Sequence, residues 1–231
     1  MSDQYYSVAI DGPAGAGKST LARRVAGELG FLYVDTGAIY RTVGCYMRLM
    51  GISPRDVDGV TRLLDEVNIS IRYGSDGLQH MILNGADVTG EIRTPEMSHY
   101  ASCVSAIPAV RDFLLEMQQK LARENSVVMD GRDIGTVVLP SADVKIFLTA
   151  SIEVRAERRC RELTEKGETV SYDQILDDMK KRDRQDSTRE TAPLRQAADA
   201  VLLDTSGLTL DQSAQRILEI VQKKLLEKSG R

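Results

Sequence analysis

The sequence predicts an α/β fold in which helices cover both faces of a parallel five-stranded sheet. Two observations indicate it. Five short apolar runs are continuous rather than alternating and rich in β-branched residues, which is typical of strands buried on both faces. Amphipathic helical patterns separate these runs, so strands and helices alternate along the chain. With 231 residues, 42% hydrophobic and 28% charged, the chain can bury a core and is too apolar to be disordered.

We expect the strands at residues 7–10, 31–34, 127–129, 144–148 and 200–203. A helical pattern over residues 21–29 follows the first strand. Two further helices are predicted by apolar residues that share one helical face, at Val60, Leu63, Leu64 and Val67, and at Phe113, Leu114, Met117 and Leu121. A capping box at residues 209–212 opens the last helix.

Residues from about 68 to 90 depart from this alternation. Two turn signals, at residues 74–77 and at Asn84–Gly85, separate segments with strand-like alternation, which predicts a small antiparallel β meander. We interpret it as an insertion, packed against the main sheet, within one domain that spans residues 1–231.

A charged segment from about residue 153 to 190 predicts two helices joined at residues 166–170. It contains few apolar residues and many arginines, so we expect it to pack weakly and to act as a mobile lid. Two ordinary surface helices are the alternative interpretation.

The chemistry begins with a glycine-rich loop. Residues 12–19, GPAGAGKS, match GxxxxGK[ST] at every fixed position and lie between a strand and a helix. The glycines let backbone N–H groups surround phosphate oxygens, and the helix that follows presents its positive end to the same anion. The loop therefore predicts a nucleoside triphosphate site of the phosphate-loop NTPase type, formed by Gly12, Pro13, Ala14, Gly15, Ala16, Gly17, Lys18, Ser19 and Thr20.

Within this loop, Lys18 can reach the β- and γ-phosphates, the Ser19 hydroxyl can ligate Mg²⁺, and Thr20 lies near the α-phosphate. A GTPase is set aside because its other signatures are missing. Residues 56–59 spell DxxG but lie in a polar loop ahead of a helix, and residues 84–87 lack the lysine of a guanine-reading NKxD.

Two other predicted strands end in polar side chains. Thr36, Tyr40 and Arg41 follow one strand, and the sequence Asp-Gly-Arg-Asp at residues 130–133 follows another. Ligands collect at the carboxyl ends of parallel strands, so these side chains predict a second, phosphorylated substrate. Asp130 occupies a position that resembles Walker B, from which it could orient a water molecule on Mg²⁺.

Four motifs in order, GPAGAGKST, DTGAIYR, DGRDIGT and RDRQDSTRETAPLRQAADA, resemble those of the bacterial cytidylate kinases, a family of nucleoside monophosphate kinases. The resemblance covers residues 8 to 226. It implies transfer of the γ-phosphoryl group of ATP to CMP or dCMP, giving CDP or dCDP and ADP, with Mg²⁺ as the cofactor. It also implies that the chain is a single kinase domain with an acceptor-side insertion and a lid.

The same resemblance implies roles for individual residues. Catalytic roles fall to Lys18, Arg41, Arg132 and Arg158, and Arg158 also binds ATP. The acceptor nucleotide would contact Thr36, Tyr40, Arg41, Ser102, Arg111, Arg132, Asp133, Arg182, Asp186 and Arg189. In this set Arg41 and Arg132 hold the acceptor phosphate. Ser102, Arg111 and Asp133 read the cytosine with Arg189 nearby, and Arg182 and Asp186 meet the pentose. Arg155, Arg158 and Arg159 match the lid arginines without a ranking among them.

The chemistry of the acceptor agrees with this interpretation. A nucleoside monophosphate already carries an anionic oxygen, so the reaction needs charge neutralisation and alignment rather than a general base. Cytosine offers an N4 donor and two acceptors, O2 and N3, which an Asp and an Arg complement. A kinase for UMP or AMP is the alternative among enzymes. A regulator that hydrolyses ATP slowly is the alternative from another class.

Composition limits the partners. A net charge of −4 argues against nucleic acid as a partner, and no apolar run is long enough to span a bilayer. The N-terminus lacks the basic flank of a secretory signal, so we expect a cytoplasmic protein. Three isolated cysteines and two isolated histidines predict neither a disulfide frame nor a zinc site. A monomer is the default expectation.

Overall fold

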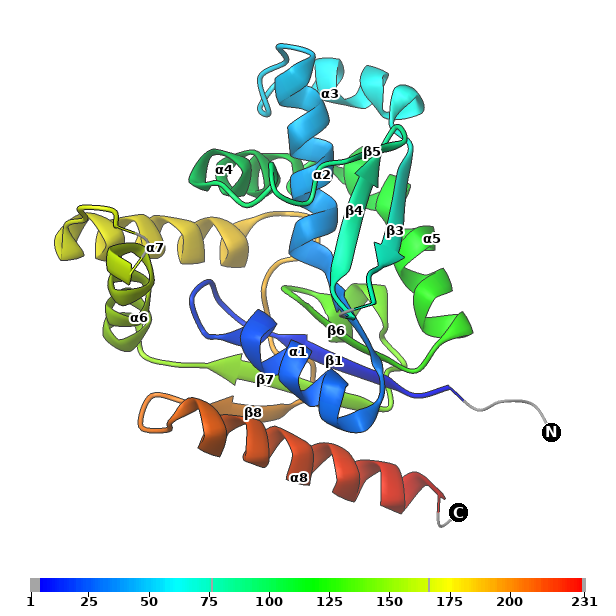
Figure 1. Ribbon diagram of the computed structural model, residues 1–231, viewed down its shortest axis with the longest axis vertical. Coiled ribbons are helices and arrows are strands. Elements are labelled where there is room, and N and C mark those ends of the chain that lie inside the picture. The colour runs from blue at the N-terminus through cyan, green and yellow to red at the C-terminus, as the bar shows by residue number, and fades with distance from the viewer. Residues whose placement is uncertain (1–4, 76, 166, 230–231) are drawn as a thin grey trace. The chain divides into compact units, whose positions relative to one another are not determined.

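The five predicted strands form one sheet in the computed structural model, which describes residues 5–75, 77–165 and 167–229 (Figure 1). Their spatial order is β2 (Leu32–Asp35), β6 (Val127–Gly131), β1 (Ser7–Asp11), β7 (Val144–Thr149) and β8 (Val201–Asp204). The pairs β1–β6, β1–β7 and β7–β8 all run parallel. The prediction of an α/β fold with a parallel sheet is confirmed. Because β1 is central, the loop that follows it starts in the middle of the sheet.

The chain packs as two compact units. Residues 1–33 and 122–231 form the first, here called the sheet unit, and residues 34–121 form the second, here called the inserted unit. The inserted unit is larger than the predicted insertion because it includes helices on both sides of the meander. The prediction that the whole chain is one kinase domain with a lid stays a prediction.

Two helices cover one face of the sheet within the sheet unit. They are α1 (Lys18–Leu29) and α8 (Leu210–Ser229), which lie side by side in Figure 1. They bury a continuous apolar core with the strands, formed by Val8, Ile10, Leu21, Val25, Val128, Ile146, Leu148, Ile217 and Val221 among others. Ala9 and Met129 alternate with this set along β1 and β6 and are also fully buried. Both faces of the central strands are therefore shielded from water, which explains their continuous apolar sequence.

The predicted capping box at the start of α8 is present. The backbone N–H of Gln212 donates to the Thr209 hydroxyl at 3.2 Å, and the Gln212 side chain accepts from the Thr209 N–H at 2.9 Å. These reciprocal bonds satisfy two donors that a helix start otherwise leaves without partners.

The charged segment forms two helices, as predicted. They are α6 (Ile152–Glu165) and α7 (Tyr172–Thr188), which pack on each other. Lys166, at the start of the predicted joint, lies outside the described residues. Mobility of this pair as a lid stays a prediction. The remaining element of the sheet unit is a π-helical turn at Ile134–Val138, which directly follows the Arg132–Asp133 pair.

The inserted unit begins where β2 ends. Its helices are α2 (Thr36–Leu49), α3 (Val57–Leu63), α4 (Pro95–Val104) and α5 (Pro108–Glu124). The predicted face from Val60 to Val67 is divided, because α3 ends at Leu63 and a 3₁₀ turn continues over Leu64–Glu66. Helices α2 and α4 pack so closely that a Cβ atom on Gly44 would lie 2.7 Å from the Cβ atom of Tyr100.

The predicted meander is confirmed. Strands β3 (Ile69–Tyr73), β4 (Gln79–Leu83) and β5 (Ala86–Asp87) form an antiparallel sheet in that order. Asn84 and Gly85 both have positive φ, 47° and 89°, as a tight hairpin requires. Gln79 ties the meander to the end of β2, since its side-chain amide bonds both the N–H and the carbonyl of Asp35, at 2.8 and 3.3 Å.

Candidate functional site

The glycine-rich loop at residues 12–17 joins β1 to α1, as the motif requires. Gly17 caps α1 in a left-handed conformation with φ 86°, and no side chain caps this helix. The first N–H groups of α1 therefore have no partner within the helix, which leaves them available to an anion.

Gly12 has a different reason to be glycine. A Cβ atom there would lie 1.9 Å from the carbonyl oxygen of Leu148 on β7. The packing of the sheet, rather than a bound phosphate, thus excludes any side chain at the start of the loop.

Lys18 is buried, and its Nζ donates to the carbonyl oxygen of Pro13 at 2.8 Å. The pKa of Lys18 is lowered to about 7, first by burial and then by the positive charges of Arg132 and Arg182, which nearby carboxylates offset only in part. Three cationic side chains therefore lie close enough to repel one another, and a polyanion among them would relieve that repulsion.

The Asp130 carboxylate at the end of β6 is held by two hydroxyl groups. Ser19 Oγ donates to its Oδ2 at 3.0 Å, and Tyr33 Oη donates to its Oδ1 at 2.8 Å. A hydroxyl and a carboxylate are hard oxygen ligands of the kind that Mg²⁺ prefers when a phosphate and water supply the rest. The residues fit a divalent cation held together with a nucleotide. In the part of the chain that the structure describes, no cluster of three His, Cys, Asp or Glu side chains offers a site made of protein ligands alone.

Arginines and carboxylates alternate beside Lys18. Arg132 Nε donates to Asp186 at 2.8 Å, and Arg189 meets Asp133 at 3.4 Å. Burial works to raise the pKa of Asp186, but the charges of Arg132, Arg182 and Arg189 outweigh it and hold that pKa below its usual value. The sheet unit therefore brings the predicted acceptor residues of β6 and α7 into one network.

The three arginines that the sequence assigns to a lid differ from one another in what they contact. Arg155 is buried, and its Nη1 donates to the carbonyl oxygen of Ala14 in the glycine-rich loop at 2.9 Å. Both Nη atoms also bond the Asp183 carboxylate, at 3.2 and 2.6 Å, so one side chain links α6, α7 and the loop.

Arg158 lies elsewhere. Its guanidinium donates to the hydroxyl and the carbonyl oxygen of Thr205, at 3.2 and 2.7 Å, after the end of β8. Arg159 pairs with Glu162 on its own helix at 2.7 Å. Of these three arginines it is Arg155 that contacts the glycine-rich loop, and the catalytic role predicted for Arg158 stays a prediction.

The inserted unit places its predicted residues at the start of α2. Thr36 is the first residue of that helix and is buried, and Asp35 caps the helix by accepting from the Ala38 N–H at 2.8 Å. The same carboxylate pairs with Arg41 at 2.9 Å. The cap thus fixes the direction of the Arg41 side chain one helical turn further on.

Tyr40 and Arg111 lie together, with the Arg111 guanidinium 5.6 Å from the centre of the Tyr40 ring. Arg111 also donates to the carbonyl oxygen of Ser105, whose hydroxyl donates in turn to the carbonyl oxygen of Ser102, at 3.1 and 3.0 Å. Ser102 and Arg111 are therefore joined through the junction of α4 and α5.

Four residues that sequence reasoning missed take part in these networks. Tyr33 bonds Asp130, and Asp183 bonds Arg155. Gln79 bonds the end of β2, and Asp11 bonds the turn after Asp133. Asp11 carried a signal, because it is a carboxylate at the end of an apolar strand, as Asp130 is. The other three carry none, since their partners are distant in sequence.

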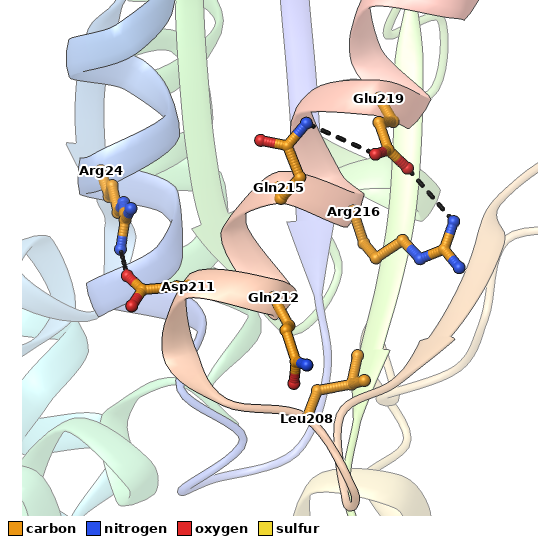
Figure 2. A pocket seen from close by; sticks show the side chains of 7 residues that line it. All are labelled: Arg24, Leu208, Asp211, Gln212, Gln215, Arg216 and Glu219. Carbon is orange, nitrogen blue, oxygen red and sulfur yellow. Dashed lines mark hydrogen bonds and ion pairs between the residues drawn. The ribbon is translucent and has the colours of Figure 1, made fainter.

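A shallow groove of about 510 Å³ lies between α1 and the start of α8 (Figure 2). Its polar lining is engaged in surface pairs, Arg24 with Asp211 and Arg216 with Glu219. None of the predicted site residues lines it, so it is not the candidate site.

The remaining predictions concern cysteines and membranes. Cys45, Cys103 and Cys160 are free thiols, and Cys45 is buried. Among the helices formed by described residues, none has the length and apolar content that crossing a bilayer requires.

Comparison with known proteins adds to this geometry. The family model described as Cytidylate kinase matches residues 8–223. The chain is 51% identical to a cytidylate kinase from Caldicellulosiruptor bescii, over 94% of this chain and 96% of the relative. It is 52% identical to a cytidylate kinase from Carboxydothermus hydrogenoformans, over 94% and 97%. A solved structure of an uncharacterized protein from Eubacterium ventriosum covers 94% of this chain and 98% of its own, with a TM-score of 0.52 and 13% identity. That last likeness concerns the fold alone.

Proposed function

The chain belongs to the cytidylate kinase family and is thus an ATP-dependent kinase of CMP or dCMP; we propose that the residues described above carry out this phosphoryl transfer. The observation that carries the assignment is the arrangement around Lys18, which is buried, bonds the Pro13 carbonyl of the glycine-rich loop at 2.8 Å and lies within electrostatic reach of Arg132 and Arg182. The carboxylates of Asp130 and Asp186 offset only part of this positive charge, and a triphosphate facing a monophosphate would offset the rest.

On the donor side, the loop of residues 12–17 and the start of α1 surround the phosphates of ATP with N–H groups. Lys18 exchanges its bond to the Pro13 carbonyl for the β- and γ-phosphate oxygens. Arg155, which already contacts the loop at Ala14, keeps the two lid helices beside it. Arg158 is assigned to ATP as well, once the lid has closed.

Kinases of this family generally need a divalent metal, and we assign Mg²⁺. Ser19 would hold it directly, and Asp130 through a water molecule. The ion would neutralise charge that develops on the transferred phosphoryl group. Tyr33 holds the Asp130 carboxylate from its other oxygen, so that carboxylate keeps one orientation.

On the acceptor side, Arg41 and Arg132 hold the phosphate of CMP. Thr36 and Tyr40 line its pocket, Arg182 and Asp186 contact the pentose, and the cytosine is read by Ser102, Arg111, Asp133 and Arg189. An ionised Asp accepts a hydrogen bond from N4 of cytosine, and an Arg donates to O2 and N3. A uracil, which has a carbonyl in place of the N4 amine, would face that carboxylate with an acceptor, so this set favours cytosine.

No general base appears in this scheme because the acceptor phosphate is already an anion. The barrier lies in bringing two anions together and in aligning them, and the arginines act on both. Closing α6 and α7 over the nucleotides would also exclude water, which competes with CMP for the phosphoryl group.

The experiment is ADP release from ATP with CMP, dCMP, UMP, AMP and GMP as separate acceptors. We expect the largest kcat/KM with CMP or dCMP and little ADP release without an acceptor. A preference for UMP or AMP would reject the assignment of the cytosine-reading residues. ATP turnover that is independent of any acceptor would instead favour a regulator that hydrolyses ATP.

A further inference from the structure

The buried carboxylate of Asp11 has no part in the scheme above. Asp11 is the last residue of β1 and directly precedes Gly12. Its side chain is buried with 4% exposure. A carboxylate removed from water needs compensating partners, so its contacts reveal what it does.

Those partners are two backbone N–H groups of another loop. Ile134 donates to Asp11 Oδ1 and Gly135 donates to Oδ2, both at 2.7 Å. Asp11 also pairs with Gly131 in the register of β1 and β6. The side chain thus continues the link between the two strands beyond the end of the sheet, from the glycine-rich loop to the segment that carries Arg132 and Asp133.

The bonds of Asp11 also replace a cap. Ile134 and Gly135 begin the π-helical turn, and Asp133 stands at its cap position without a side-chain capping bond. Asp11 supplies the cap from β1 instead. The Asp133 carboxylate, which would otherwise serve its own turn as Asp residues commonly do, meets Arg189 at 3.4 Å.

The fit between Asp11 and this turn is close. A Cβ atom on Gly135 would lie 3.3 Å from Asp11 Oδ2 and 3.1 Å from the Lys145 side chain. The pKa of Asp11 is raised to about 6 because burial outweighs the two N–H bonds, which lower it, and the charges of Asp133 and Lys18 act on it in opposite directions. Asp11 is therefore within electrostatic reach of one residue from each of the two loops that it joins.

We propose that Asp11 is a positioning residue, which aligns the donor loop with the Arg132–Asp133 segment and leaves the Asp133 carboxylate to read the acceptor base. The proposal rests on the proposed function, because it assigns no new substrate. Its effect should appear in alignment and in base selectivity, not in the affinity for ATP.

The test is Asp11→Asn, a variant of nearly equal size. Its amide has a single acceptor atom, so one of the two N–H groups would face an NH₂ group. We expect kcat with CMP to fall by about 10²-fold, since small misplacements of reacting groups have effects of that order. We expect the ratio of kcat/KM for CMP over UMP to fall by about tenfold, as Asp133 turns to cap its own helix. The Kd for ATP should stay within about threefold.

A matched control lies at the other end of β1. Asp143 is a shielded carboxylate that accepts from the Ser7 N–H at 2.7 Å, remote from both loops. Asp143→Asn should lower Tm and leave kcat and selectivity unchanged. Should Asp11→Asn behave in the same way, with normal kcat and selectivity per folded molecule, Asp11 is merely structural and the proposal is overturned.

A second variant keeps the test decisive if Asp11→Asn does not fold. Gly135→Ala would place a Cβ atom 3.3 Å from Asp11 Oδ2 and 3.1 Å from the Lys145 side chain, so it crowds the carboxylate without removing it, and it should show the same loss of selectivity in weaker form. Wild-type selectivity in a folded Gly135→Ala protein would overturn the proposal. The wild-type chain is assayed first with CMP and dCMP. If it phosphorylates neither, the proposed function itself is rejected, independently of the role of Asp11.

Discussion

The cationic side chains of the two units differ in what surrounds them. In the sheet unit, burial and the charges of Arg132 and Arg182 together lower the pKa of Lys18, and the carboxylates of Asp130 and Asp186 offset the effect of the arginines only in part. In the inserted unit, Arg41 is paired with the Asp35 carboxylate at 2.9 Å and Arg111 lies over the Tyr40 ring. Both units pair an arginine with a carboxylate, since Arg132 bonds Asp186 at 2.8 Å. The sheet unit differs because two arginines also act on one buried lysine.

The cations around Lys18 face both of the ligands that we assign, because Arg132 and Arg182 are also assigned to the acceptor. A triphosphate carries several negative charges and can compensate a cluster of cations. A single phosphate and a nearly neutral base require fewer cations, each held in a defined direction. Preorganised cations that need no rearrangement during the reaction contribute most to transition-state stabilisation. We therefore expect a change at Lys18, beside the donor phosphates, to act mainly on turnover and a change at Arg41 to act mainly on acceptor binding.

The largest effect should follow from Lys18→Met. Removing the cation that faces the β- and γ-phosphates should lower kcat by about 10²- to 10³-fold, while Tm stays near that of the wild type because a buried charge is also removed. ADP release and thermal unfolding measure the two quantities. Lys224→Met, on the exposed face of α8, is the control and should change neither. Normal turnover in Lys18→Met would contradict the role assigned to Lys18 at the donor phosphates.

Arg41→Met tests the other unit. We expect KM for CMP to rise by about 10- to 100-fold, since a charged hydrogen bond to the acceptor phosphate is lost. The Kd for ATP should not change. Arg48→Met, at the far end of α2, serves as the matched variant and should bind CMP normally. An equal weakening of ATP and CMP binding by Arg41→Met would contradict the assignment of Arg41 to the acceptor phosphate.

Proton uptake on ATP binding tests whether the phosphates of ATP lie beside Lys18. Lys18, with its pKa lowered to about 7, is mostly neutral at pH 8, and phosphates beside it would raise that pKa. ATP should therefore bind with uptake of up to about one proton, and its affinity should fall as pH rises above 7. Calorimetry in buffers of different ionisation enthalpy measures the uptake. Lys18→Met should show none, and equal uptake in both proteins would contradict the assignment.

The smallest effect is expected for Tyr33→Phe. Loss of the hydroxyl that holds Asp130 Oδ1 should raise the Mg²⁺ concentration needed for half-maximal ATP binding by about threefold to tenfold. Titration of ATP binding against Mg²⁺ measures this without turnover. Tyr5→Phe, an exposed tyrosine, should leave the Mg²⁺ dependence unchanged. An unchanged Mg²⁺ dependence in Tyr33→Phe would contradict the assignment of Asp130 to the Mg²⁺ site.

Sequence reasoning was strongest where the signal is local. The strands were found within one or two residues at their ends, the meander from its turn residues, and the start of α8 from its capping box, because each depends on neighbours along the chain. It was weaker for the arginines of α6. Arg155, Arg158 and Arg159 are the same residue type within one turn of the same helix. Nothing along the chain distinguishes Arg155, which contacts Ala14, from Arg158, which contacts Thr205.

The sequence by itself determined the family, the α/β class, the glycine-rich loop and which residue types could face two phosphorylated substrates, since motifs and periodicity are properties of the chain. Only the tertiary structure decided that Asp11 caps a turn more than a hundred positions away, that Tyr33 shares Asp130 with Ser19, and that Arg132 and Arg182 reach the charge of Lys18. Hydrogen bonds and Coulomb interactions depend on distance in space, and folding sets those distances by packing strands and helices that the chain order keeps apart.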